Sequence, residues 1–235
     1  MNQIRNLTLL LLLSISACQP AEKQQTSTDQ IEVESIQVAP DEPRFEALDI
    51  SNWSDSSFVD LSLLSNSFVY DMKYAGLDNF LKEKVYPCAH CLLRKPVALA
   101  LIEANDSLAQ HNMQILIFDC YRPLSVQKKM WEIYPKPSYV ANPKYGSVHN
   151  RGGAVDIGLV SDAGEIVDMG TGFDHFGPEA HHSYSDLPIQ VKDNRALLRS
   201  IMMHFGFNPI RTEWWHYNYQ DNKKFEVSDF PLDCN

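Results

Sequence analysis

The chain has 235 residues, of which 44% are hydrophobic and 21% are charged, as in ordinary globular proteins rather than disordered or fibrous ones. Its formal charge is −10, and its lysines and arginines form no cluster. These features argue against nucleic acid and anionic lipid surfaces as partners. The length suits one hydrophobic core, and we expect a single globular domain over residues 46–235.

Residues 1–17 predict an export signal. Arg5 gives the segment a positive start, Leu7–Leu13 is almost entirely apolar, and small residues follow up to Cys18. The apolar run is too short to span a membrane and is typical of a cleaved secretory signal. The sequence ISAC at residues 15–18 resembles the lipobox of bacterial lipoproteins, which implies that Cys18 is acylated. The alternative is an ordinary cleaved signal with a chance cysteine.

The lipobox resemblance also implies a location in the bacterial cell envelope. Several acyl chains on Cys18 would anchor the protein stably to a membrane. Gln19 stands where inner-membrane lipoproteins usually carry Asp, so we expect the outer membrane, with the domain facing the periplasm. Residues 19–43 are rich in Gln, Ser, Thr, Glu and Pro and lack apolar periodicity. We therefore expect a flexible tether over residues 18–45.

Export places the remaining cysteines in an oxidising compartment, where disulfides form. The spacing of Cys88 and Cys91 looks like half of a zinc site, but no second half follows at suitable spacing, so disulfides or free thiols are favoured. Four cysteines allow three complete pairings, between which the sequence does not choose. They are Cys88, Cys91, Cys120 and Cys234.

The hydrophobic periodicity predicts an α+β domain with a central antiparallel sheet flanked by helices. One strand is expected between Phe58 and Tyr74, where Phe68, Tyr70 and Met72 alternate with more polar positions. Helices are expected over Val97–His111, from Pro123 to about Tyr134 and over Asp193–Phe205, and a buried strand over Met113–Cys120.

Arg122 directly follows the predicted buried strand, in the sequence DCYRP at residues 119–123. Pro123 restricts Arg122 to extended backbone geometry, which places an arginine rigidly at the end of a buried strand. Such an arginine is well placed to face a cleft. The alternative is a structural ion pair with Asp119 or another acid.

Two stretches, SVHNRGGAVD at residues 147–156 and TEWWHY at residues 212–217, together supply two imidazoles and two carboxylates. A small cation that keeps one open coordination position needs about three ligands drawn from His, Asp or Glu, and a nearby base. His149, Asp156 and His216 are candidate ligands, and Glu213 is the candidate base. This set predicts a zinc hydrolase.

Local geometry constrains this site. His149 and Asp156 can converge only if the glycines between them make a turn or bulge. Glu213 and His216 would lie on opposite faces of a regular strand, so we expect a bulge or twist between them. Composition leaves other histidines open as competing ligands, namely His175, His181 and His182.

Several motifs carry a resemblance to a known family. They are SxHxxGxAxD at residues 147–156, ExWH at 213–216, YDMKY at 70–74, DCYRP at 119–123 and MGTGFDHF at 169–176. Together they resemble the D-alanyl-D-alanine dipeptidases, the VanX-type branch of the zinc D-Ala-D-Ala peptidases. The similarity spans nearly the whole domain, from Phe68 to Tyr219, with several motifs in the family order.

The resemblance implies a role for each site residue. One zinc ion would be held by His149, Asp156 and His216. Glu213 would be the general base and then the general acid, and Arg122 would stabilise charge on the tetrahedral intermediate.

The same resemblance implies that Asp174 and Ser147 help to hold the free amino end of a small D-amino-acid dipeptide. Tyr74, within a matching motif, would join them in substrate binding. We therefore expect a zinc D,D-dipeptidase. Two alternatives remain: a D,D-carboxypeptidase that trims peptidoglycan stem peptides, and a wall-binding lipoprotein without catalysis. The expected lipid anchor departs from the cytoplasmic members of the family.

Overall fold

The computed structural model describes residues 45–234. The expected signal at residues 1–17, the expected acylation site Cys18 and the expected tether up to residue 44 lie outside the described residues. Among residues 45–234, every helix is too short or too polar to cross a membrane.

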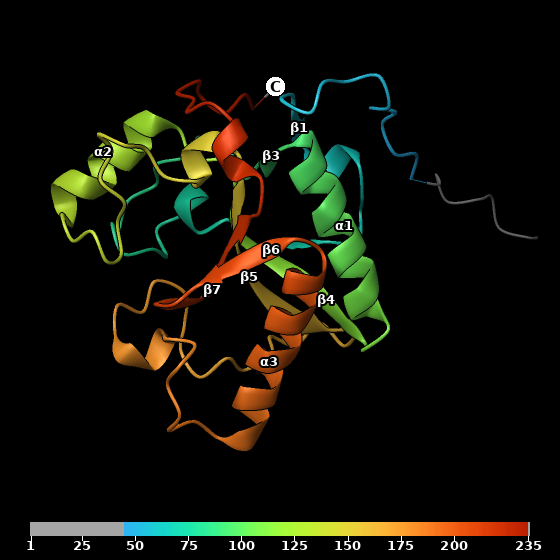
Figure 1. Cartoon of the computed structure of the whole chain (residues 1–235), viewed down its shortest axis with the longest axis vertical. Helices are drawn as coiled ribbons and strands as arrows, with labels where there is room; N and C mark the ends of the chain where they lie inside the picture. Colours follow the sequence, from blue (N-terminus) through green and yellow to red (C-terminus); the bar gives the residue numbers. More distant parts are fainter. Residues whose placement is uncertain (1–44, 235) are drawn as a thin grey trace, which may run out of the picture. The chain divides into compact units, whose positions relative to one another are not determined.

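A five-stranded sheet forms the centre of the fold (Figure 1). Its inner strands β4 (Met113–Asp119), β5 (Ala154–Ser161) and β7 (Glu213–Tyr219) pair antiparallel in that order. β6 (Phe207–Ile210) lies antiparallel to β7 at one edge, and β2 (Val69–Tyr70) lies parallel to β4 at the other. The predicted α+β class is confirmed.

The predicted antiparallel arrangement is confirmed for most of the sheet, and the β2–β4 pair is the exception because it is parallel. Parallel neighbours need a long crossover connection. Here the crossover contains β3 (Leu92–Arg94) and helix α1 (Lys95–Ala109). β3 itself pairs with β1 (Phe58–Asp60) in a separate two-stranded sheet.

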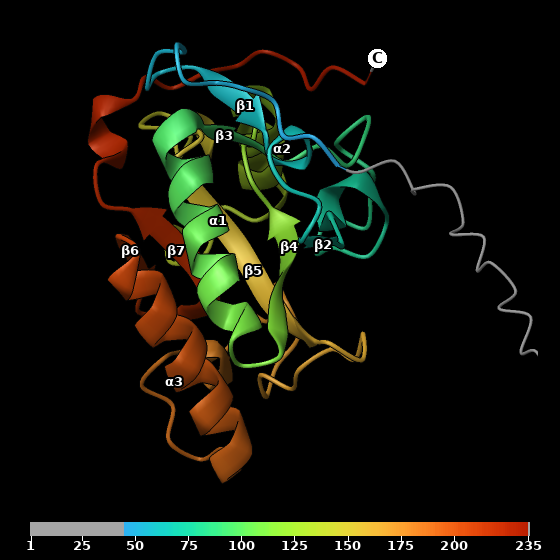
Figure 2. The same cartoon turned by 90° about the vertical axis from the view of Figure 1, so that its right-hand side faces the viewer.

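Helices α1 and α3 (Ile189–His204) pack against each other (Figure 2). α1 also packs against β4, and α3 packs against β6. α2 (Leu124–Ile133) lies away from both. The periodicity of α1 is confirmed, because its predicted apolar positions are all buried. They are Val97, Leu101, Ala104 and Leu108.

The predicted start of α3 at Asp193 was wrong by four residues, since the helix begins at Ile189 directly after Pro188. Proline fixes its own backbone in a conformation compatible with a helix start, and this outweighed the capping preference of Asp193. The predicted end at Gly206 is confirmed. This glycine has a φ of +85°, the left-handed geometry that commonly follows a helix.

The strand expected between Phe58 and Tyr74 is much shorter than its alternating pattern indicated. Only Val69 and Tyr70 pair with β4, and Lys73–Ala75 forms a 3₁₀ turn. The turn buries the ring of Tyr74. The alternation of apolar residues therefore reflects burial on both sides of a short edge strand, and not a long strand.

Two disulfides select one of the three possible pairings, Cys88 with Cys234 and Cys91 with Cys120. Cys91 and Cys120 are fully buried and connect the segment before β3 to the end of β4. Cys88 and Cys234 are 146 residues apart and fasten the C-terminal segment to the same region. The half zinc site suggested by Cys88 and Cys91 is therefore excluded.

We expect the double variant Cys88→Ala/Cys234→Ala to lower the free energy of unfolding by about 2–5 kcal/mol, because the unfolded chain is released from a long closed loop. Denaturant unfolding without reducing agent measures this change. Both residues are at least partly exposed, so the substitutions leave no core cavity. An unchanged unfolding midpoint would contradict the prediction.

Candidate active site

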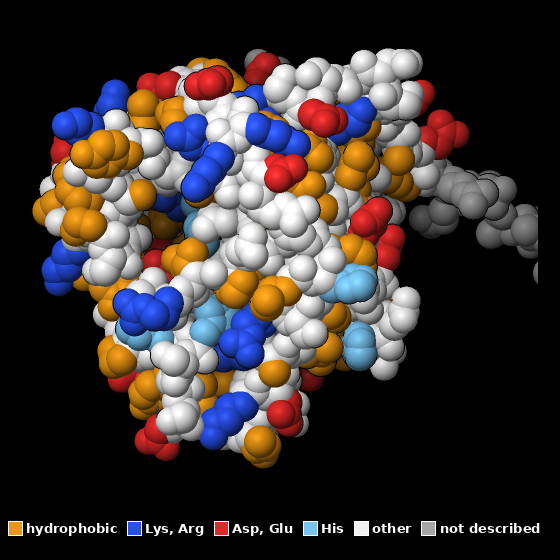
Figure 3. Space-filling model, in the orientation of Figure 1, with side chains coloured by type: hydrophobic (Ala, Val, Ile, Leu, Met, Phe, Trp, Pro, Cys, Tyr) orange, Lys and Arg blue, Asp and Glu red, His pale blue; other side chains and the backbone are white. Residues whose placement is uncertain are grey.

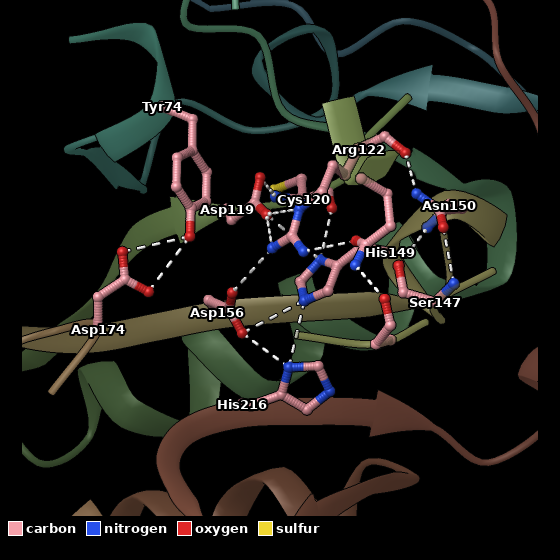
Figure 4. Close-up of polar contacts among 12 residues, drawn as sticks. Tyr74, Asp119, Cys120, Arg122, Ser147, His149, Asn150, Asp156, Asp174 and His216 are labelled. Atoms are coloured by element: carbon pink, nitrogen blue, oxygen red, sulfur yellow. Dashed lines mark hydrogen bonds and ion pairs between the residues drawn. The ribbon is translucent and has the colours of Figure 1, made fainter. Parts of the chain in front are cut away.

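Three side chains from different segments converge at one point (Figure 4). His149 lies in a 3₁₀ turn (His149–Arg151), Asp156 on β5 and His216 on β7. His149 Nε2 lies 3.2 Å from His216 Nδ1 and 3.3 Å from Asp156 Oδ1, and the distance from His216 Nδ1 to Asp156 Oδ1 is 2.9 Å. The predicted ligand set is brought together.

The turn that carries His149 depends on Gly152. Its φ is +67°, and a Cβ atom there would lie 2.3 Å from the ring of Phe58, so only glycine fits. Reciprocal bonds close the turn: Ser147 N–H donates to Asn150 Oδ1 at 2.6 Å, and Asn150 N–H donates to Ser147 Oγ at 3.2 Å. The expected glycine turn is confirmed, although His149 lies in this turn and not on a bent strand.

The predicted irregularity near Glu213 is also confirmed. Across β6 and β7, Pro209 faces Tyr217, but the next residue, Ile210, faces Glu213. The three residues of β7 between these two pairs therefore have no partner on β6, which makes a pronounced bulge in β7. As a result Glu213 and His216 line the same pocket, whereas they would face opposite ways on a regular strand.

Each imidazole is oriented by a bond from its other nitrogen. The carbonyl of Cys120 can only accept, so His149 Nδ1 donates to it at 2.7 Å. His216 Nε2 donates to the amide oxygen of Asn218 at 2.9 Å. The remaining ring nitrogens, His149 Nε2 and His216 Nδ1, both face Asp156 Oδ1. Burial opposes ionisation of Asp156, but the two histidines hold its pKa well below the ordinary value.

This arrangement fits a bound metal ion. Three potential ligand atoms, two imidazole nitrogens and one carboxylate oxygen, face one another, and a cation stabilises such a set. Ligand atoms about 2.0–2.1 Å from a tetrahedral zinc ion are about 3.4 Å apart, close to the separations found here. The bonds to Cys120 and Asn218 are the outer contacts that fix histidine ligands.

Arg122 serves both of the roles considered from sequence. Its guanidinium donates to Asp119 Oδ2 at 2.6 Å and to Gln127 Oε1 at 2.9 Å, so the structural ion pair exists. The same group lines the pocket, with Nη2 3.8 Å from Asp156 Oδ2. Tyr86 donates to the other oxygen of Asp119 at 2.8 Å, which holds the carboxylate in place.

Asp174 and Tyr74 lie together at one side of the pocket. The Tyr74 hydroxyl donates to the Asp174 carboxylate, 3.2 Å from each oxygen. Asp174 has a φ of +60°, an uncommon conformation for a residue other than glycine. Burial, together with the charge of Asp156, raises the pKa of Asp174 to about 7. Ser147 lies on the opposite side of the ligand atoms from Asp174 in Figure 4.

The pocket is small, with a cavity volume of about 70 Å³. Glu213 lines it and is 7% exposed, and burial raises its pKa to about 8 against the influence of His216. Aromatic rings close one wall, where Phe176 stacks on Tyr134 and Tyr139. The pocket therefore suits a small polar ligand better than a bulky one.

The three histidines that competed as ligands lie elsewhere. His175 bonds to Glu179 at 3.0 Å at the surface, and neither His181 nor His182 lines the pocket. Within residues 45–234, the potential metal-ligating side chains that lie close together are the three predicted ligands. Asn218 was not predicted from the sequence, although it follows His216 at the two-residue spacing that places strand side chains on one face.

Comparisons with known proteins agree on one family. The family described as D-Ala-D-Ala dipeptidase matches residues 54–232. The D-alanyl-D-alanine dipeptidase of Escherichia coli K12 is 36% identical over 177 residues, which cover 75% of this chain and 89% of that protein. The D-alanyl-D-alanine dipeptidase of Enterococcus faecalis V583 is 31% identical over 188 residues, covering 71% of this chain and 93% of that protein.

A solved structure of the vancomycin resistance D,D-dipeptidase VanXYg with a D-Ala-D-Ala phosphinate analogue is more distant. It is 21% identical, with a TM-score of 0.38, over 57% of this chain and 53% of that chain. The sequence matches alone are sufficient: this chain belongs to the D-Ala-D-Ala dipeptidase family of metallopeptidases.

Proposed function

We propose that the protein hydrolyses the free dipeptide D-Ala-D-Ala to two D-alanines with one bound zinc ion. The observation that carries this proposal is the convergence of three potential metal-ligand atoms beside Glu213 in one small pocket. His149, Asp156 and His216 would hold the ion. When bound, zinc supplies a Lewis acid for the amide carbonyl and activates water near neutral pH.

The chain's own residues would move the protons and stabilise the developing charge. Glu213 takes a proton from the attacking water and later gives it to the leaving amine, work worth roughly two to four powers of ten in rate. Its elevated pKa, about 8 in the protein alone, supports a carboxylate that holds a proton readily between these steps. Arg122, fixed by Asp119, faces the negative charge that develops on the carbonyl oxygen.

The two sides of the pocket suggest how a dipeptide would be oriented. Asp174, with Tyr74 bonded to it, offers a buried carboxylate for the substrate ammonium. Ser147 lies on the other side, and its hydroxyl proton is free for the substrate carboxylate because its oxygen accepts from Asn150. This orientation revises the expectation that Ser147 and Asp174 both hold the amino end.

We also propose that the protein is a lipoprotein, acylated at Cys18 and facing the periplasm from the outer membrane. The support is the sequence alone: a short apolar export signal, the lipobox-like ISAC and Gln19 after the cysteine. Several acyl chains give stable anchoring, whereas one gives marginal binding. The activity would then act on D-Ala-D-Ala outside the cytoplasm.

The zinc-loaded protein should release D-alanine from free D-Ala-D-Ala far faster than from N-acetyl-D-Ala-D-Ala, because acetylation removes the ammonium that Asp174 would bind. Measurement of D-alanine release from both substrates tests this. Cleavage of the blocked peptide alone would identify a D,D-carboxypeptidase. Cleavage of neither would favour a wall-binding protein.

In the same assay, we expect Glu213→Gln to lower kcat by about 10²–10⁴-fold, because the amide has nearly the same shape but cannot accept the proton. Zinc content, measured by elemental analysis, should stay at that of the native protein. Glu165→Gln is the matched control at an exposed position and should retain full activity. Equal activity of both variants would remove Glu213 from the mechanism.

We expect Asn218→Ala to weaken zinc affinity about 10–100-fold, because His216 loses the acceptor that fixes its ring. Competition with a chelator measures the dissociation constant. Asn208→Ala is the control, since Asn208 faces Asn218 across the β6–β7 pair and is exposed. If both variants bind zinc like the native protein, the orientation of His216 does not depend on Asn218.

We expect Cys18→Ser to move the full-length protein, expressed in a bacterial host, from the detergent phase to the aqueous phase in a detergent partition experiment. Gln19→Asp is the matched variant. It should stay in the detergent phase but fractionate with the inner membrane. A Cys18→Ser protein that still partitions into detergent would rule out anchoring through this cysteine.

A further inference from the structure

A second pocket lies between α3 and the loop at residues 182–187, with a volume of about 380 Å³. It shares no lining residue with the pocket around His149 and His216. Behind it lies β7, because the ring of His182 packs against Tyr217, the neighbour of His216, with centroids 6.2 Å apart. The second pocket is therefore a separate site on the reverse side of that strand.

Three cations of α3 line this pocket, Lys192, Arg195 and Arg199. Their spacing of three and four residues places them on one face of the helix. Among the described residues, none of the three has a carboxylate within 4.0 Å, although the chain carries a formal charge of −10. Figure 3 shows Lys, Arg and His side chains gathered over the part of the surface where Figure 1 places α3.

The three cations differ in what already engages them. Arg195 is 6% exposed and donates to the carbonyls of Met169, Glu179 and His181, so it is fixed in position. Lys192 and Arg199 are exposed at the pocket, and their side chains have no hydrogen bond or ion pair within residues 45–234. A fixed guanidinium beside two unengaged cations is a preorganised positive site.

His182, which lines the pocket, and Tyr217, which packs behind it, carry polar atoms without partners. His182 Nε2 and the Tyr217 hydroxyl are both buried and form no hydrogen bond among the described residues, and Tyr217 is fully buried. Burial, Arg199 and Arg195 lower the pKa of His182 to about 4, so its ring is neutral at pH 7 and has one N–H to donate. Buried polar groups without partners call for an explanation, and a ligand group bound in this pocket would supply one.

The mouth of the pocket combines hydroxyl groups with apolar surface. Ser183 and Ser185 can donate to an anion, and Leu187 and Ala196 offer a small apolar contact. We propose that this pocket binds a small organic anion whose phosphate or carboxylate group is held by Arg195, Arg199 and Lys192. Arginine matches both groups with paired hydrogen bonds, and the apolar part of the ligand rests on Leu187.

Nuclear magnetic resonance titration of the zinc-loaded protein tests this site, with inorganic phosphate and acetate as separate probes at constant ionic strength. The backbone amide signals of residues 183–187 should shift and saturate with at least one probe, which also tells phosphate from carboxylate. The signals of residues 147–151 report binding at the zinc site instead. Shifts confined to residues 147–151, or shifts that never saturate, would overturn the proposal.

Variants then assign the binding to α3. Arg199→Ala and Lys192→Ala should each weaken the probe that binds by about tenfold, since each removes one charge-assisted contact. Both residues are exposed, so the variants should fold, which circular dichroism checks. Lys128→Ala removes an exposed cation from α2 and should leave binding unchanged. Equal weakening by Lys128→Ala would show unspecific attraction and overturn the site. The outcome is independent of dipeptide hydrolysis.

Discussion

The site depends on one register, the pairing of β5 with β7 that sets Asp156 directly opposite His216. These residues are 60 positions apart, yet as partners in adjacent strands their side chains share one face of the sheet. A slip of one residue would turn His216 away from Asp156 and bring Tyr217 in its place. The register is held on both sides of β7, by β5 and by the bulged pairing with β6. His149 then joins this pair through a turn outside the sheet.

The end of β4 connects the covalent framework of the domain to this site. The disulfide between Cys91 and Cys120 fixes the residue whose carbonyl orients His149. Arg122 lies two residues further, and its backbone N–H donates to the His149 carbonyl at 3.2 Å. Its own carbonyl accepts a hydrogen bond from the side-chain amide of Asn150 at 2.7 Å. One short segment therefore positions a ligand by its backbone and the pocket guanidinium by its side chain.

The sequence predicted the chemistry of the site better than its surroundings. Residue types and local spacing pointed to His149, Asp156, Glu213 and His216 but left other histidines open, and the family motifs favoured this set. Alternation alone required a bulge or twist in β7. The start of α3 was missed because Pro188 and Asp193 are both acceptable helix-start residues, and the helix begins directly after the proline. The disulfide pairing and the contacts of Asp119 join residues distant in sequence, so no local pattern encodes them.

The charges around the pocket explain why this arrangement needs cations. Arg122 and Asp119 form a close ion pair, and the other acids of the pocket are Asp156, Glu213 and the partly buried Asp174. Burying a carboxylate without compensation costs several kcal/mol, and the raised pKa values of Glu213, about 8, and Asp174, about 7, record that cost. A dipositive ion beside Asp156 and Glu213 and an ammonium group beside Asp174 would together compensate three negative charges. Bound cations at this point would therefore relieve the cost of burying these carboxylates.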